Sequence, residues 1–167
     1  MLTDWKKCLA KSAVLLAVLT LVQSFYLSQS AFAQCVPSNF SYHWLQRQEY
    51  LGGHTIDRHV GKSDHQLVNR LINAPRISAA STYPDLRTAA TNIQAALRAN
   101  RNKLNSWVLD AAIGEKRAVN YTAREVVGHV ASRPPYLSNI SNSRKLRAVM
   151  KKTANGDCLL LTSYPAR

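Results

Sequence analysis

The stretch GHTIDRHVGKSDHQLVNRL, residues 53–71, is the most informative segment of this 167-residue sequence. Its second half has the features of a helix start, because Ser63 and Gln66 are spaced as a capping box. Apolar residues then recur every three to four positions, which is the helical period. Pro75 disfavours helix at the residue before it, so we expect this helix to end at about Ala74.

Helical patterning resumes further along the chain. Pro84 and Asp85 open this second region, and apolar residues keep a three-to-four residue rhythm to about Ala112. Asparagine favours helix caps over helix interiors, so we expect residues 100–102 to divide the region into two helices.

Strand signals dominate the second half of the chain. Residues 118–130 are rich in Val, Thr and Tyr, which favour strands, and residues 77–83 are also expected to be extended. Near the C-terminus, an Asn-Gly pair lies between two apolar runs, residues 146–150 and 158–164. This arrangement is the strongest short signal for a β-hairpin.

The remaining segments show no helix or strand pattern. Residues 34–50 are rich in aromatic side chains but have no clear periodicity, and residues 51–55 form a turn. Residues 132–143, with two prolines and several Ser and Asn, are predicted to be a loop. Helices followed by antiparallel strands indicate an α+β domain.

The first 33 residues have the features of a cleavable secretory signal peptide. Three lysines precede a largely apolar run, residues 13–22, and the segment ends in the small-residue motif Ala31-Phe32-Ala33. We therefore expect cleavage after Ala33 and a secreted or periplasmic mature protein. The apolar run is shorter than the roughly 20 residues that span a bilayer, so we expect no stable membrane anchor after cleavage. A retained anchor is the alternative.

Residues 34–167 would then form a single domain with a large positive charge. Removal of the signal segment takes away three lysines and one aspartate, which changes the formal net charge from +13 to +11. Such an excess suits a polyanionic partner: nucleic acid, anionic lipid or acidic glycan.

Cleavage would also leave an even number of cysteines. Cys8 is lost with the signal segment, whereas Cys35 and Cys158 remain. A cysteine pair in an exported protein indicates a disulfide, which here would close a loop of more than a hundred residues. Two free thiols are the alternative.

Three histidines, His54, His59 and His65, are concentrated in the opening stretch. Histidine can both accept and donate a proton near neutral pH, so these residues are candidates for acid–base chemistry. Their spacing fits no helical zinc motif, and we expect neither a metal nor a cofactor.

Three further residues are candidates for binding a phosphate. Arg70 lies at the border of the apolar face of the predicted helix, from which it could reach a cleft or extend into solvent. Thr162 and Tyr164 share one face of the last predicted strand, where their hydroxyls could donate hydrogen bonds. Threonine and tyrosine are also ordinary strand residues, so the pattern alone does not separate these roles.

Several motifs together resemble one known family. They are Gly53-His54-Thr55, His59-Val60-Gly61-Lys62-Ser63, Arg70-Leu71, Ala80-Ser81-Thr82-Tyr83 and Leu161-Thr162-Ser163-Tyr164-Pro165. The sequence from about residue 51 to 165 is similar to the bacterial ribonuclease-A-like toxin domain, which forms the C-terminus of contact-dependent inhibition and related polymorphic toxins.

The resemblance implies a site and a reaction. It assigns catalysis to His59, Arg70, Thr162 and Tyr164, with His54 as the leading second proton-transfer group and Lys62 as a substrate-binding residue. The implied activity is metal-independent cleavage of RNA by transesterification, which leaves a 2′,3′-cyclic phosphate. A cognate immunity (inhibitor) protein is a further implied partner.

The sequence departs from the family in two respects. Its domain follows a signal segment directly rather than a long delivery protein, and it contains the predicted disulfide. A non-catalytic cationic protein that binds nucleic acid or another polyanion is the rival interpretation. It accounts for the charge but not for the His/Arg/Thr/Tyr set in family order.

Overall fold

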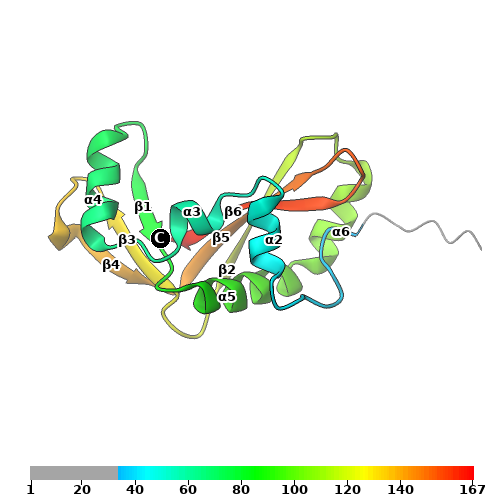
Figure 1. Ribbon diagram of the computed structural model, residues 1–167, viewed down its shortest axis with the longest axis horizontal. Helices are drawn as coiled ribbons and strands as arrows, with labels where there is room; N and C mark the ends of the chain where they lie inside the picture. Colours follow the sequence, from blue (N-terminus) through cyan, green and yellow to red (C-terminus); the bar gives the residue numbers. More distant parts are fainter. Residues whose placement is uncertain (1–33) are drawn as a thin grey trace, which may run out of the picture. The chain divides into compact units, whose positions relative to one another are not determined.

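Three helices come first in the computed structural model, which describes residues 34–167 (Figure 1). They are α2 (Trp44–Tyr50), α3 (Thr55–His59) and α4 (Asp64–Asn73). The capping box of α4 is confirmed, since Ser63 Oγ accepts the Gln66 N–H and the Gln66 side chain accepts the Ser63 N–H. The proposed signal segment lies outside the described residues.

The second helical region is divided as predicted. Helices α5 (Leu86–Ala99) and α6 (Arg101–Asp110) meet at Asn100, which ends one and begins the other. The carboxylate of Asp85 accepts the Thr88 N–H at 2.7 Å and so caps the start of α5.

The strands form two separate three-stranded antiparallel sheets. In the first, β1 (Ala79–Thr82), β3 (Gly128–Ser132) and β4 (Ile140–Ser143) have the order β1-β3-β4. In the second, β2 (Lys116–Thr122), β5 (Lys145–Lys152) and β6 (Cys158–Ala166) have the order β2-β5-β6. The predicted C-terminal hairpin is β5–β6, and the predicted α+β class is confirmed.

One segment without a clear sequence pattern is partly helical, and the loop prediction for residues 132–143 was wrong. Residues 34–50 contain α2, a helix of seven residues, which is too short to show a clear period. Residues 132–143 contain a short 3₁₀ helix (Leu137–Asn139) and β4, whose sequence Ile-Ser-Asn-Ser is a poor strand signal. Strand β4 is extended because it pairs with β3.

Two apolar clusters stabilise the domain. The larger one packs α5 and α6 against the second sheet, with Leu97, Leu104, Leu146 and Met150 fully buried. The smaller one packs Leu67 and Leu71 of α4 against Ala80 and Ala131 of the first sheet.

Helix α3 joins the free edges of the two sheets. At its start, the His54 N–H donates to Leu161 O of β6, and the Thr55 hydroxyl accepts the Ser163 N–H. At its end, the Tyr83 N–H donates to His59 O at 2.8 Å beside β1. The chain approaches β6 so closely before α3 that a Cβ at Gly53 would lie 2.7 Å from Leu160 O. Residues at the end of α3 therefore lie where the two sheets meet.

The N-terminal segment is fastened to the rest of the domain. The predicted disulfide between Cys35 and Cys158 is present, and the backbone N–H groups of Cys35 and Val36 donate to Asn105 Oδ1. Within residues 34–167, no helix has both the length and the apolar character that crossing a bilayer requires.

Candidate active site

His59, the last residue of α3, is the most buried of the predicted catalytic residues, with 8% of its surface exposed. Its Nδ1 lies 3.0 Å from the carbonyl oxygen of Ser81 in β1. A carbonyl oxygen only accepts, so Nδ1 carries the proton of this hydrogen bond. In the neutral ring Nε2 is then unprotonated and free to accept a proton.

The surroundings of His59 keep it neutral. Burial lowers the pKa of His59 to about 4, and the charges of Arg70, His54 and Arg58 act in the same direction. The hydrogen bond to Ser81 opposes the shift but does not reverse it. At neutral pH, His59 is therefore in the form that a general base requires.

Arg70 lies on α4 and is held beside the same histidine. Its Nη1 donates to the carbonyl oxygen of Arg58 at 3.0 Å, which fixes the guanidinium next to α3. Burial, followed by the charge of Arg58, lowers the pKa of Arg70. Arginine keeps its proton in proteins, so the site retains a fixed positive charge.

Strand β6 contributes the two predicted hydroxyl residues. The ring centroid of Tyr164 lies 5.2 Å from that of His59, with the planes tilted by 34°. Thr162 Oγ1 is enclosed and has no hydrogen-bond partner among the described residues. An enclosed hydroxyl without a partner costs stability, and its donor is not used by any of the described residues.

His54 occupies the opposite end of α3. Its backbone is tied to Leu161, the residue before Thr162. Burial, followed by the charge of Arg58, lowers the pKa of His54, while Glu49 and Asp57 raise it less. The same helix therefore places His54 and His59 along one stretch of β6.

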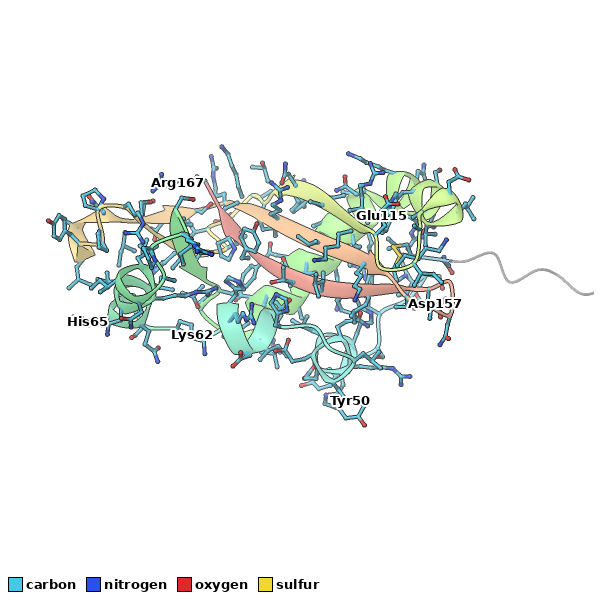
Figure 2. The ribbon with its side chains drawn as sticks, turned by 90° about the horizontal axis from the view of Figure 1, so that it is seen from above. Tyr50, Lys62, His65, Glu115, Asp157 and Arg167 are labelled. Carbon is cyan, nitrogen blue, oxygen red and sulfur yellow. A yellow bond between two sulfur atoms is a disulfide. The ribbon has the colours of Figure 1, made fainter. Side chains whose placement is uncertain are left out.

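Lys62 is placed less favourably than the other predicted residues. Its backbone N–H donates to Thr82 Oγ1 at 2.9 Å beside the start of α4 (Figure 2). The charges that act on His59 come instead from Arg70, His54 and Arg58. The structure thus brings His59, Arg70, Tyr164 and His54 together and leaves Lys62 at the margin.

Two contributors were missed by the sequence analysis. Arg58 precedes His59 and both supplies charge and holds Arg70 through its carbonyl. Ser81 orients His59 through its carbonyl oxygen, a group that every residue has. Arg58 could have been predicted from its position next to the motif histidine. The role of Ser81 could not, because its contribution comes from the backbone and not from its residue type.

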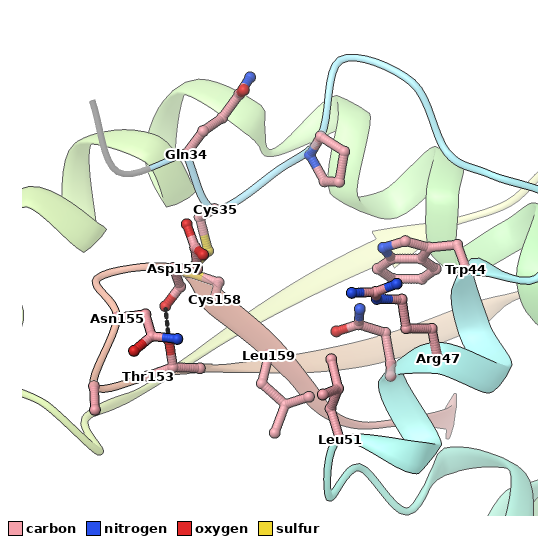
Figure 3. Close-up of a pocket in the computed structure, with 13 residues that line it drawn as sticks. Gln34, Cys35, Trp44, Arg47, Leu51, Thr153, Asn155, Asp157, Cys158 and Leu159 are labelled. Atoms are coloured by element: carbon pink, nitrogen blue, oxygen red, sulfur yellow. Dashed lines mark hydrogen bonds between the residues drawn. A yellow bond between two sulfur atoms is a disulfide. The ribbon is translucent and has the colours of Figure 1, made fainter. Parts of the chain in front are cut away.

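Other features lie away from this cluster. A hollow of about 590 Å³ lies beside the disulfide, lined by residues such as Trp44, Arg47 and Asp157, and it includes none of the predicted site residues other than the two cysteines (Figure 3). Among residues 34–167, no three His, Cys, Asp or Glu side chains gather in a group that could hold a metal ion.

The α+β fold, with a buried histidine, an arginine and a Thr/Tyr pair on the last strand, agrees with the resemblance to ribonuclease-A-like domains. A sequence model of the bacterial CdiA-CT RNase A domain matches residues 53–165, so the chain belongs to this family of ribonuclease toxin domains.

A solved structure agrees with this assignment. The domain is similar to the crystal structure of a CdiA-CT/CdiI complex from Y. kristensenii 33638, with 27% identity and a TM-score of 0.60. The match covers 69% of this chain and 100% of that chain. A comparison with curated proteins gives no match.

Proposed function

We propose that the domain is an exported, metal-independent endoribonuclease that cleaves RNA by transesterification. One observation carries the proposal: a buried, neutral His59 with Nδ1 tied to Ser81 lies against Tyr164 and beside the cation Arg70. A neutral base next to a fixed positive charge is the arrangement that activation of a hydroxyl beside a phosphate requires.

The proposed reaction uses the 2′-hydroxyl of the substrate as nucleophile. His59 Nε2 takes the 2′-hydroxyl proton, the 2′-oxygen bonds to phosphorus, and the bond from phosphorus to the 5′-oxygen breaks. The leaving 5′-oxygen takes a proton from His54, and a 2′,3′-cyclic phosphate remains. Arg70 stabilises the phosphorane charge with a bidentate fork, while Thr162 and Tyr164 donate to its oxygens.

The lowered pKa values of the two histidines fit this cycle. Burial lowers both pKa values in the free protein, and nearby cations lower them further. A bound phosphate would bring negative charge to Arg58 and Arg70 and so raise the pKa of both histidines. Substrate binding would then allow His54 to hold the proton that it donates.

The proposal also includes a protein partner and a route of export. The solved structure with the similar fold is a complex with CdiI, and we take this as support for a cognate immunity protein that blocks the toxin. The signal segment supports export to the periplasm or the medium.

The proposal is tested with purified residues 34–167 and a DNA strand that contains one ribonucleotide. Cleavage should occur at that ribonucleotide alone, should persist in EDTA, and should leave a 2′,3′-cyclic phosphate, which mass spectrometry detects. All-DNA strands should bind through their phosphates but remain intact, because they lack the nucleophile. A cationic binder without activity would cut neither strand, and loss of cleavage in EDTA would contradict metal independence.

A further inference from the structure

The second sheet packs one face on α5 and α6, while its other face is open along β5 and meets α3 at Tyr164 of β6. In β5, Leu146, Ala148 and Met150 point into the core between this sheet and α5. Side chains alternate along a strand, so Lys145, Arg147, Val149 and Lys151 lie on the opposite face. Lys145 and Arg147 are exposed there. Figure 2 is seen from this side, with strands β6, β5 and β2 in front of α5.

This face carries positive charge and no negative charge. Lys145, Arg147 and Lys151 of β5 and Lys116 of β2 define what we call the basic sheet face. The other positions on the face, taken from the strand pairing, contain no Asp or Glu: Ala118, Asn120, Thr122, Val149, Leu159, Thr162, Tyr164 and Ala166. Within residues 34–167, the two ion pairs are Arg117–Glu115 and His129–Asp64, and neither involves the basic sheet face.

Part of this arrangement opposes folding. Lys116 lies directly opposite Lys151 in the β2–β5 pairing, and like charges in opposite positions destabilise a sheet. Charges that oppose folding and have no internal partner indicate an external anion.

The basic sheet face continues into the candidate active site. Arg147 pairs directly with Tyr164 across β5–β6, and such neighbours have Cβ atoms about 5 Å apart. Lys145, two residues before Arg147, lines a hollow of about 300 Å³ at the end of β6. Arg144 and Arg167 line the same hollow. Residues two apart in a strand are separated by about 6.6 Å. The cations therefore form a row that passes beside Tyr164, with Lys145 on one side of Arg147 and Lys151 on the other.

We propose that the basic sheet face binds the phosphates of the single RNA strand next to the scissile phosphate, and that the hollow takes a further phosphate. The choice of RNA rests on the proposed function, because the row of cations passes the site where RNA would be cut. Hydroxyl and amide side chains, such as those of Asn120 and Thr122, accompany the cations and suit a hydrated phosphate backbone rather than a lipid interior.

The test compares two triple variants of residues 34–167 that lose the same charge. Lys145→Gln/Arg147→Gln/Lys151→Gln removes cations from the basic sheet face. The control, Arg76→Gln/Arg87→Gln/Lys103→Gln, removes three exposed cations from the turn before β1 and from α5 and α6. The probe is a fluorescent RNA strand of about twelve nucleotides with every 2′-hydroxyl methylated, so it binds but cannot be cut.

The face variant should bind the probe about tenfold or more weakly at 0.1 M salt. The slope of log affinity against log salt should be shallower by about 2, since each phosphate contact with a single strand contributes about 0.7. The control should stay within about threefold of the unchanged domain, as expected for bulk charge alone. Thermal unfolding monitors folding, and removal of opposed charges should not lower the melting temperature.

Equal weakening by both variants, or no weakening by the face variant, would overturn the proposal. A parallel measurement uses vesicles of anionic phosphatidylglycerol. If the face variant lost only vesicle binding, the face would belong to a membrane surface and the proposal would be wrong. The probe cannot be cut, so the binding measurement does not depend on catalysis. The two proposals can therefore fail separately: the EDTA experiment tests cleavage, and this experiment tests binding.

Discussion

The hydrogen bond between His59 and Ser81 selects one chemical form of the histidine. The Ser81 carbonyl fixes the proton on Nδ1, and burial makes a second proton on Nε2 unfavourable. The residue is thus ready to accept a proton but holds one poorly in the free protein. A second group must supply the proton to the leaving oxygen, and His54 is the nearest candidate along α3.

These shifts predict an acidic pH profile for the free enzyme. A base works when neutral, so kcat/KM should fall on the acid side only as the pH approaches about 4, the pKa of His59. An acid works when protonated, so the alkaline decline should begin below 6.5, because the pKa of His54 is lowered from that value. Initial rates across pH, with circular dichroism as a check on folding, measure this profile. An acid limb centred at 6.5 or above would contradict it.

Arg70→Lys separates charge from geometry. Lysine keeps the positive charge but cannot form two parallel hydrogen bonds to a phosphoryl group. If the fork acts in the transition state, kcat should fall by about a hundredfold or more, while KM changes little. Kinetics on an RNA oligonucleotide measure the two constants. Arg76→Lys, at an exposed position, is the matched control. A rate near that of the control would remove Arg70 from the proposed mechanism.

At the scale of single residues, the sequence identifies the side chains of the candidate site better than the backbone groups that orient them. Motif order identified His59, Arg70, Thr162 and Tyr164, and the structure gathers the first two and Tyr164 around the end of α3. Their catalytic roles remain predictions. The contribution of Ser81 could not be predicted, because any residue supplies a carbonyl and only the pairing of distant segments shows which one.

The elements differ in how far local sequence determines them. A capping box begins α4, and an Asn-Gly turn with Gly156 at φ +84° joins β5 to β6, so both were predictable. Helix α2 and strand β4 contact segments that are distant in the sequence. Helix α2 packs against β6, and β4 pairs with β3. Residues 118–130 divide between two sheets. This division depends on pairing with distant strands, which the periodicity of the sequence does not predict.

Thr55→Val tests how β6 positions α3. Thr55 is buried, and its hydroxyl accepts the Ser163 N–H at 2.9 Å. Valine keeps the shape but leaves that N–H without a partner, so the free energy of unfolding should fall by about 1–3 kcal/mol. Because α3 carries both histidines, kcat should fall as well. Urea denaturation and initial rates measure the two effects.

Thr91→Val is the control for that substitution. Thr91 is exposed on α5, so the same change there should alter stability by no more than about 0.5 kcal/mol. If Thr55→Val were equally mild in stability and rate, the hydrogen bond would not be what holds α3 in place.

On the scale of the whole domain, the candidate site and the disulfide lie towards opposite ends of β6. Tyr164 is near the C-terminal end of this strand and Cys158 begins it, and the basic sheet face extends between them, because Lys151 pairs with Leu159. The sequence predicted both the excess charge and the cysteine pair. The sequence could not show that the cations gather on one open face, because this depends on which face of the sheet packs against the helices.

Removal of the disulfide should therefore lower stability without changing the chemistry. Cys35 and Cys158 are 123 residues apart, and closing a loop of this size stabilises a fold by about 4.7 kcal/mol in the chain-entropy description. Cys35→Ser/Cys158→Ser should lose a large part of that free energy of unfolding in urea titrations. At a temperature where the variant stays folded, its kcat on RNA should match that of the unchanged domain, because the candidate site lies several residues further along β6. Treatment with a reductant should bring the unchanged domain to the stability of the variant and leave the variant as it was. A loss below about 1 kcal/mol would mean that the hydrogen bonds to Asn105 hold the N-terminal segment without the disulfide.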